Sequence, residues 1–333
     1  MASENEIKER LDEILVPGAM RSLSKLNLVK GIGVDGKKVS VSLASPAVNP
    51  QTQNWLKAKV AEELKGLPDV DEVEVDFVDA QAKDVNDIRN VVAVMSGKGG
   101  VGKSLVTGLL GLSLARRGYD VGILDADITG PSIPRMFGIS GRPAGSETGI
   151  MPALSKLGIS IMSINLLLPN EDDPVIWRGP LIAKTITQFW EDVLWGKQDY
   201  LLVDLPPGTA DAPLTVMQSI PLTGVVMAFT PQELAAMVVR KAVQMTRHMQ
   251  IPIIGVVENM SYLTLPDSGK RLEIFGKSKA IEMADAASAP ILAQLPIDPE
   301  LAQLCDAGEI ERYDSEVLQQ MADAFLNSVS AKT

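Results

Sequence analysis

One glycine-rich segment restricts the fold of this chain more than any other part of its sequence. It reads Gly97-Lys98-Gly99-Gly100-Val101-Gly102-Lys103-Ser104. The apolar run Val91–Ser96 comes directly before it, and a run with leucines at helical spacing, beginning at Leu105, comes directly after it. A strand, a loop of the pattern GxxxxGK(S/T) and a helix in this order are typical of a phosphate-binding loop at the carboxyl end of a buried strand.

The residue types in this loop fit a nucleoside triphosphate. Glycines let backbone N–H groups converge on phosphate oxygens without a Cβ in the way, and the N-terminus of the following helix adds positive potential. Lys103 supplies a positive charge to the β- and γ-phosphates, and the Ser104 hydroxyl is an oxygen ligand suited to Mg²⁺. We therefore predict that residues 97–105 bind ATP with Mg²⁺ and that Lys103 takes part in hydrolysis.

Aspartates follow two further apolar runs. One run ends at Leu124 and leads into Asp125 and Asp127, and the other ends at Val203 and leads into Asp204. An apolar strand that ends in an aspartate is the form in which many phosphate-binding loops anchor Mg²⁺, directly or through water. We predict that Asp127 and Asp204 complete the Mg²⁺ site together with the loop serine.

Apolar runs alternate with helix-like stretches from Val91 onward. The clearest strands are Val91–Ser96, Val121–Leu124, Tyr200–Val203, Gly224–Phe229 and Ile253–Val257. Continuous apolar strands separated by helices indicate a mainly parallel sheet covered by helices on both faces. The expected fold class is therefore α/β, with the architecture of a P-loop NTPase.

Residues 1–79 form a separate small α/β domain in our interpretation. An Asp-Gly pair between the apolar runs 26–34 and 37–44 predicts a β-hairpin, and a helix-like run and a further strand follow it. Residues 80–90 are polar and poor in strand formers, which indicates a linker. The nucleotide-binding domain is then expected to occupy residues 91–333.

Composition limits the function classes that remain. The formal net charge is −11, which disfavours general nucleic-acid binding and a basic membrane-surface patch. The N-terminus is charged, and no apolar run reaches the roughly 18–20 residues that span a bilayer. One cysteine and one histidine cannot form a four-ligand zinc site within one chain. The sequence predicts a cytoplasmic protein without nucleic-acid or membrane partners.

Lys98 is not required by an ordinary phosphate-binding loop. The arrangement KGGVGKS resembles the deviant Walker motif of the MinD, nitrogenase iron-protein and Mrp families. In those families the early lysine reaches the nucleotide of the opposite subunit. The resemblance therefore implies a homodimer in which Lys98 acts across the interface to stabilise phosphate charge in the transition state.

Further segments resemble successive blocks of the Mrp family, whose members are ATPases associated with iron–sulfur cluster carriage and assembly. These segments are Asp125–Pro134, Trp177–Pro180, Asp204–Thr209, Thr230–Gln232 and Val257–Ser261. The small front domain is similar to the short α/β domain that often precedes Mrp ATPases. The resemblance thus covers nearly the whole chain.

The Mrp resemblance implies roles for particular residues. Asp127 is expected to position the attacking water as a switch I residue, and Asp204 to belong to switch II and the Mg²⁺ site. Asn259 is expected to contact the adenine, since its amide offers a donor and an acceptor to a purine edge. Pro296 and Asp298 lie in a segment that resembles a second base-flanking stretch.

The chain departs from the Mrp pattern at the cluster site. Leu265 and Ser268 stand where the family has the two cysteines of a CxxC pair, and Cys305 is the single cysteine of the chain. A [4Fe–4S] cluster normally takes four cysteine thiolates. We therefore assign no iron–sulfur ligand to this sequence and read Cys305 as a small buried apolar residue.

Three functions remain open from the sequence. Our main interpretation is a homodimeric, Mg²⁺-dependent ATPase that acts as a nucleotide-driven switch on a partner enzyme or metalloprotein. The alternative is an iron–sulfur cluster carrier or assembly ATPase, as in the family, with cluster ligands from a partner or of an unusual kind. A positioning ATPase of the MinD sort is disfavoured, because the final helix-like segment lacks a basic amphipathic face.

Overall fold

The computed structural model describes residues 2–128, 130–168, 179–209 and 211–331, without the side chains of residues 179, 180, 183, 211 and 233–239. The family-like segment Trp177–Pro180 thus lies outside the described side chains. The chain divides into two compact units. The first unit comprises Met1–Arg89, Arg142–Leu154 and Gln188–Gln198, and the second comprises Asn90–Gly141, Ser155–Thr187 and Asp199–Thr333.

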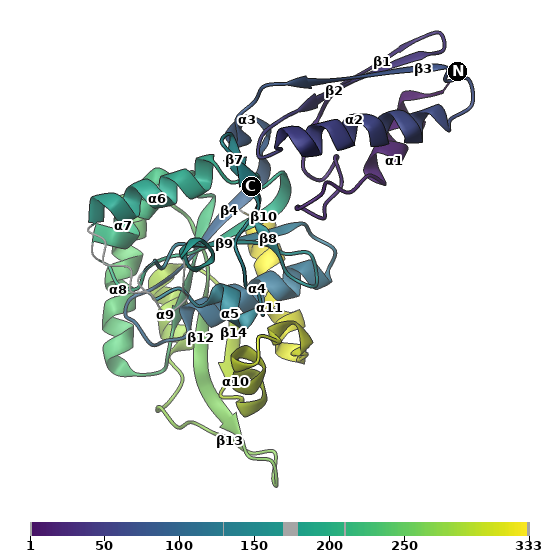
Figure 1. The fold of residues 1–333 in the computed structure, drawn as a ribbon. Helices are drawn as coiled ribbons and strands as arrows, with labels where there is room; N and C mark the ends of the chain where they lie inside the picture. The colour runs from purple at the N-terminus through teal and green to yellow at the C-terminus, as the bar shows by residue number, and fades with distance from the viewer. Residues whose placement is uncertain (1, 129, 169–178, 210, 332–333) are drawn as a thin grey trace. The chain divides into compact units, whose positions relative to one another are not determined.

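The first unit is built on a three-stranded sheet with the strand order β1-β2-β3. Its elements are α1 (Glu4–Asp12), β1 (Val29–Asp35), β2 (Lys38–Ala44), α2 (Pro50–Lys65), β3 (Glu72–Val78) and α3 (Ala82–Val85) (Figure 1). Strand β2 pairs antiparallel with β1, through the predicted Asp-Gly turn, and parallel with β3. Val39, Val41 and Leu43 of β2 are buried against α2, so the alternation in the sequence matches the buried face.

Two segments from far along the sequence belong to the first unit. Residues 142–154 carry the short strands β6 (Gly145–Ser146), β7 (Gly149–Ile150) and β8 (Ala153–Leu154). Met151 and Leu194 are buried in the same apolar core as α1 and α2. At Gly196 a Cβ would lie 2.4 Å from the carbonyl oxygen of Lys25, so this close approach requires glycine. Local sequence patterns do not predict this tertiary contact.

The expected linker at residues 80–90 contains regular structure. It includes α3 and the first residues of β4 (Asp87–Ser96). A hydrogen bond from Gln81 N to Asp84 Oδ2 closes the start of α3. The division of the chain at residues 79 and 91 remains a prediction from the sequence.

The second unit contains the large sheet. The remaining elements, which lie wholly or mainly in this unit, are α4 (Lys103–Arg116), β5 (Val121–Asp125), α5 (Ile133–Met136), β9 (Ser160–Ser163), η1 (Ile164–Leu167), α6 (Gly179–Glu191), β10 (Lys197–Asp204), α7 (Asp211–Ser219), β11 (Gly224–Phe229), α8 (Glu233–His248), β12 (Ile253–Thr264), β13 (Arg271–Leu272), α9 (Ala280–Ala287), β14 (Ile291–Pro296), α10 (Pro299–Asp306), η2 (Ile310–Arg312) and α11 (Glu316–Ser330). The sheet order includes β13-β12-β11-β4-β10-β5-β9, with β14 beside β12.

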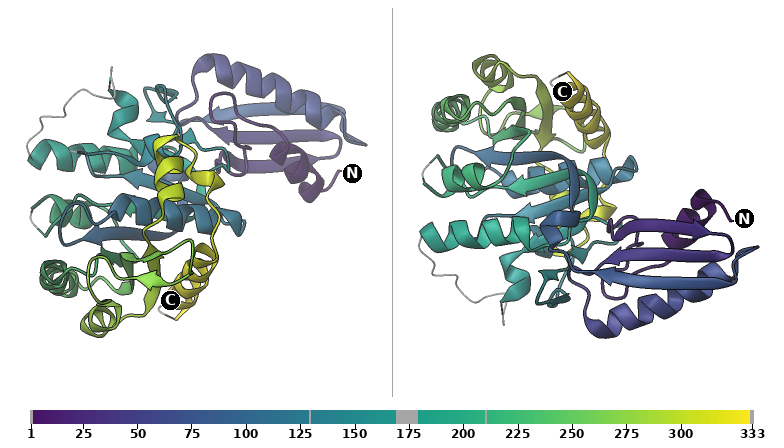
Figure 2. Two further views of the ribbon diagram at one scale, coloured as in Figure 1. Left: turned by 90° about the horizontal axis from the view of Figure 1, so that it is seen from below. Right: turned by 90° about the horizontal axis from the view of Figure 1, so that it is seen from above.

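The sheet of the second unit is mainly parallel. The pairs β5/β10, β4/β11, β11/β12, β5/β9 and β12/β14 are parallel, whereas the short β13 is antiparallel to β12. Helices lie on both sides of these strands (Figure 2). Every residue of β11 is buried, as expected for a strand covered on both faces. The predicted fold class is confirmed.

No helix in the described part of the chain combines the length and the apolar character that a membrane span needs.

Candidate functional site

The glycine-rich loop joins β4 to α4. Gly102 is the residue before α4 and has a left-handed backbone, with φ of +80°. A Cβ at this position would lie 2.2 Å from Asn259 Nδ2. Gly102 is thus fixed both by its backbone angle and by the close approach of a side chain from β12.

A buried charge cluster lies at the start of α4. Lys103 Nζ is 2.7 Å from Asp204 Oδ2 and 3.7 Å from Asp127 Oδ2. The Ser104 hydroxyl donates to Asp204 Oδ2 at 2.5 Å, and the Thr107 hydroxyl donates to Asp204 Oδ1 at 2.7 Å. The structure therefore brings together the lysine, the serine and both aspartates that the sequence singled out, at the carboxyl ends of β5 and β10.

Thr107 is a member of this cluster that the sequence analysis missed. Its hydroxyl also donates to Lys103 O at 3.1 Å. Its position four residues after Lys103 places it on the same face of α4, so helical spacing from the lysine is the signal that could have found it.

Asp125, close to this cluster, is fully buried, and its pKa is higher than that of an exposed aspartate. Burial raises the pKa of Asp125 to about 7, and the nearby Asp204 carboxylate pushes it in the same direction, while Lys103 opposes both effects. Its carboxyl oxygens accept from Asp127 N, Ile133 N and Ser163 Oγ at 3.2–3.3 Å. Asp125 thereby holds the backbone of the segment that carries Asp127.

The segment after Asp204 is held beside the loop by backbone contacts. Leu205 N donates to Val94 O at 3.1 Å, and Gly208 N donates to Ser96 O at 3.0 Å. Gly208 has a φ of +94°, a conformation that favours glycine. These few backbone bonds fix the expected switch II segment at the end of β4.

Asn259 lies against the loop in the buried interior. Its Nδ2 donates to Val101 O at 2.9 Å, and its Oδ1 accepts from Met260 N at 2.9 Å. One amide hydrogen and one oxygen lone pair remain beyond these two bonds. Asn259 therefore braces the loop in addition to the base contact expected from the sequence.

A mostly apolar cavity of about 390 Å³ opens next to Asn259. It is lined by Leu105, Met136, Asn259, Met260, Phe275, Pro296, Ile297, Asp298, Leu301, Ala302, Cys305 and Asp306. Asn259, Pro296 and Asp298, which the resemblance assigns to the base side of the site, all line this cavity, together with Leu105, the last residue assigned to the loop. Its size and apolar walls are typical of a ligand pocket.

Three lining residues carry information that the sequence analysis lacked. Asp298 caps α10 by accepting from Glu300 N at 2.9 Å, and it also accepts from the Tyr313 hydroxyl at 2.9 Å. Phe275 is contributed by the segment that follows β13, far from the loop in sequence. Cys305 packs half-buried at the cavity wall, and burial raises the pKa of its thiol to about 11, in keeping with its reading as an apolar residue.

Along the first part of the loop, Gly97 is buried, Lys98 is half-buried, and Gly99 and Gly100 are exposed. Lys98 Nζ donates to Gln232 Oε1 at 2.7 Å. Gly100 has a φ of +80°, and a Cβ on it would meet nothing within 4 Å. The structure thus places Lys98 away from the Asp204 cluster, on a residue that the sequence analysis did not assign to the site.

The family's CxxC position is occupied by an exposed hairpin. Gly269 N donates to Leu265 O at 2.9 Å, and Lys270 N donates to Ser268 Oγ at 3.4 Å. Within the described ranges, no group of three or more His, Cys, Asp or Glu side chains is arranged to hold a metal ion.

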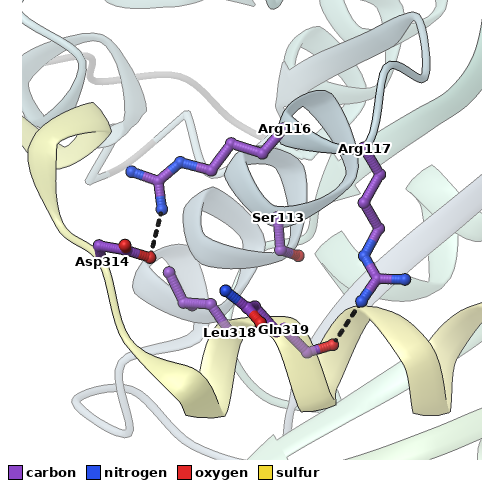
Figure 3. A pocket seen from close by; sticks show the side chains of 6 residues that line it. All are labelled: Ser113, Arg116, Arg117, Asp314, Leu318 and Gln319. Atoms are coloured by element: carbon purple, nitrogen blue, oxygen red, sulfur yellow. Dashed lines mark hydrogen bonds and ion pairs between the residues drawn. The ribbon is translucent and has the colours of Figure 1, made fainter.

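A second cavity, of about 300 Å³, lies between α4 and α11 (Figure 3). Arg116 Nη1 contacts Asp314 Oδ1 at 3.3 Å, and Arg117 Nη2 donates to Gln319 O at 2.9 Å. Arg116 pairs with Asp314 and Arg117 pairs with Asp323, so both positive charges beside this cavity are already compensated. We assign it no ligand.

The chain resembles known families over both of its parts. Residues 87–330 match the family described as NUBPL iron-transfer P-loop NTPase, and residues 4–77 match the one described as iron-sulfur cluster assembly protein. The chain is 39% identical to an iron-sulfur cluster carrier protein of Aquifex aeolicus, over 96% of this chain and 93% of the relative. A protein of the same name from Haemophilus influenzae is 36% identical over 92% of this chain and 85% of its own.

Solved structures agree with the fold. A nucleotide-binding protein from Archaeoglobus fulgidus in complex with ADP is 47% identical, with a TM-score of 0.63 over 70% of this chain and 91% of that one. MinD in the MinC:MinD complex of Aquifex aeolicus is 20% identical, with a TM-score of 0.53 over 72% of this chain and 96% of that one, which supports the fold alone. The family predicted from the loop and the Mrp-like segments is confirmed, and the chain belongs to the NUBPL iron-transfer P-loop NTPases.

Proposed function

We propose that this chain is a Mg²⁺-dependent, homodimeric ATPase that serves in the carriage or assembly of iron–sulfur clusters. The observation that carries the ATPase proposal is the convergence of Lys103, Ser104 and Asp204 within 2.5–3.3 Å of one another beside the glycine-rich loop. The names of its relatives support the cluster-related role over the partner-enzyme switch that was our main interpretation of the sequence.

The binding step follows from the charges in the cluster. Lys103 is paired with Asp204, so a triphosphate must compete with that carboxylate for the ammonium. The loop N–H groups and the N-terminus of α4 favour an anion at this place. The apolar cavity beside Asn259 suits a base, with the remaining amide hydrogen and lone pair of Asn259 available to its edge.

The oxygens of Ser104 and Asp204 fit Mg²⁺. A hydroxyl and a carboxylate oxygen meet at 2.5 Å, and such oxygens are the ligands that this ion prefers. Mg²⁺, when bound, offsets the negative charge that the phosphates bring. Ser104 would then turn its hydroxyl oxygen from the carboxylate toward the metal, and Lys103 would be released toward the phosphates.

The hydrolytic step is assigned to residues at the edge of the cluster. Asp127 lies 3.7 Å from Lys103 Nζ, near enough for its carboxylate to orient a water against the terminal phosphate. Lys98 is proposed to reach the nucleotide of the second subunit and to stabilise transition-state charge there. The backbone bonds of Leu205 and Gly208 to β4 link the same site to the expected switch II.

The chain's own donor set does not fit a [4Fe–4S] cluster. Such a cluster takes four thiolates, whereas a homodimer of this chain supplies only two cysteines. Cys305 is also half-buried in the wall of the candidate base cavity, with a thiol pKa of about 11. We therefore propose that any cluster is cargo whose thiolate ligands come chiefly from a partner, and that this chain supplies the ATP-driven step.

The test combines ATP turnover with cluster delivery. The chain, purified without oxygen, is mixed with a thiolate-bearing protein that holds a [4Fe–4S] cluster and with an apo acceptor, and transfer is followed by the acceptor's visible absorption. We expect ATP and Mg²⁺ to accelerate transfer. Hydrolysis without any influence on transfer would favour the partner-enzyme switch instead.

Two controls separate the parts of this proposal. Lys103→Met keeps the length of the side chain but removes its charge, and it should abolish both hydrolysis and the acceleration of transfer. Cys305→Ser should leave cluster transfer in the absence of ATP unchanged if the cluster ligands come from the partner. Stoichiometric iron and sulfide on the isolated chain, lost in Cys305→Ser, would contradict the assignment of ligands to a partner.

A further inference from the structure

We propose that Gln232 is a positioning residue that holds Lys98 in the resting subunit and releases it when two subunits close on ATP. This inference rests on the proposed function, because it concerns the lysine that is to act across the homodimer. Nothing in the loop motif itself points to Gln232, which lies more than a hundred residues away and is brought there by the fold.

The contact is specific in geometry. Lys98 Nζ donates to Gln232 Oε1 at 2.7 Å, a short bond between a charged donor and a neutral amide oxygen. Among the described residues, Lys98 forms no ion pair, whereas Lys103 in the same loop is bonded to Asp204. The loop therefore holds its two lysines in different ways, one by a buried carboxylate and the other by an exposed amide.

The position of Gln232 argues for a role other than helix capping. It is the residue before α8, where Ser, Thr, Asp or Asn would bond the first free backbone N–H groups. The Gln232 side chain makes no such capping bond. Pro231, directly before it, fixes the approach of the chain to this point. Its amide is thus directed at the loop and not at its own helix.

A neutral acceptor suits a contact that must break. A carboxylate in place of the amide would form an ion pair with Lys98 and resist its transfer to a phosphate of the second subunit. An apolar side chain would leave Lys98 free to sample many conformations. Because a symmetric dimer breaks this contact in both subunits, a small change in each contact is doubled in the free energy of dimer closure.

The first measurement is ATP-dependent self-association. Sedimentation with Mg²⁺ and a non-hydrolysable ATP analogue gives the dimer dissociation constant for wild type, Gln232→Ala and Gln232→Glu. We expect Gln232→Ala to tighten the dimer about five-fold, the effect of two weak exposed hydrogen bonds, and Gln232→Glu to weaken it by a similar factor. Gln244→Ala and Gln244→Glu make the same changes at an exposed position on the same helix and should leave the constant unchanged.

The second measurement does not need a dimer. Lys98 in the nucleotide-free chain is acylated with a limiting amount of an amine-reactive acetyl ester, and its labelling is read by peptide mass spectrometry. We expect faster labelling of Lys98 in Gln232→Ala and slower labelling in Gln232→Glu, with no change in the Gln244 variants. A structural role of Gln232 in α8 alone would not alter the reactivity of Lys98.

Two results would overturn the assignment. If Gln232→Ala weakens the dimer, then Gln232 supports the closed state and does not restrain Lys98 in the open one. Unchanged labelling of Lys98 in both Gln232 variants would remove the contact itself. If the wild-type chain neither hydrolyses ATP nor self-associates with it, the ATPase proposal fails and this inference fails with it, a pattern that is distinct from an active wild type with indifferent Gln232 variants.

Discussion

Asp125 should give the protein a stability that falls as the pH rises toward neutrality. Two effects compete at this carboxyl. Complete burial and the Asp204 carboxylate favour its neutral form, whereas the Lys103 ammonium and the hydrogen bond from Ile133 N favour its charged form. Burial is the largest of these effects, and the pKa of Asp125 rises from 3.8 to about 7. The folded state therefore keeps a proton that the unfolded chain has already lost.

The sign and the size follow from this difference. Between pH 4 and pH 7 the folded state binds more protons than the unfolded state at this site, so the free energy of unfolding decreases with pH. A shift of this size corresponds to about 4 kcal/mol across the whole window, at about 1.4 kcal/mol for each pH unit. Integrated between pH 5 and pH 7 alone, the loss attributable to Asp125 is about 2 kcal/mol.

The assay compares wild type with Asp125→Asn, whose side chain cannot titrate. Urea unfolding is measured from pH 5 to pH 7 without nucleotide or Mg²⁺, and the difference in stability between the two proteins is plotted against pH, which cancels the titration of the exposed carboxylates. An infrared band of a buried protonated carboxyl should be present in wild type at pH 5.5 and absent in Asp125→Asn. A wild-type stability that rises with pH relative to Asp125→Asn would refute the reasoning, because it would mean that Lys103 and the Ile133 hydrogen bond outweigh burial.

Three substitutions test the loop and its charge cluster. Gly102→Ala should destabilise the fold by about 2–3 kcal/mol, because alanine is strained at this left-handed backbone angle and its Cβ would displace the Asn259 side chain. Gly118→Ala is the control, since its φ is also positive but its Cβ would meet no atom within 4 Å, so only the backbone strain should lower its stability. Equal urea midpoints for the two variants would contradict a clash between a Cβ at position 102 and Asn259. Lys103→Met should weaken ATP binding by about 10–100-fold in calorimetry, and an unchanged affinity would remove the phosphate-binding assignment. Asp127→Asn should slow hydrolysis by about 100-fold or more and let ATP-bound dimers accumulate, and a wild-type rate would exclude its role with water.

Much of the fold could be predicted because it is encoded locally. The strands β11 and β5 begin at the residues that their apolar runs mark, and α2 buries Leu56, Val60 and Leu64 at helical spacing. The conformation of the glycine-rich loop is likewise set locally, by its glycines and by the strand and helix on either side of it. Periodicity and loop chemistry of this kind act over a few residues, so one sequence is enough to read them.

The structure of residues 80–90 and the extent of the first unit are harder to predict, because they depend on contacts between distant parts of the chain. The polar composition of residues 80–90 indicated a linker, yet Ala82 and Val85 are buried and form part of α3. The segments 142–154 and 188–198 join the first unit through contacts such as that of Gly196 with Lys25. Such contacts depend on residues far apart in the chain, and no local pattern records them.

The sequence by itself determined the class of protein and the chemistry of its loop. The glycines, Lys103, Ser104 and the two strand-end aspartates predict a phosphate site, because residue type and local spacing suffice for backbone N–H groups and charges to converge. The sequence likewise supplies one cysteine per chain, fewer than the four thiolates that a [4Fe–4S] cluster normally takes.

Only the tertiary structure decided how these parts are connected. It brings the Asn259 side chain to the backbone of Val101 and pairs Lys98 with Gln232. It also buries Asp125, which raises the pKa of that carboxyl, and places Cys305 in the wall of the candidate base cavity. Each of these depends on packing between elements that are distant in sequence. Burial and electrostatic interaction are properties of that packing, so they become readable only when the elements are assembled.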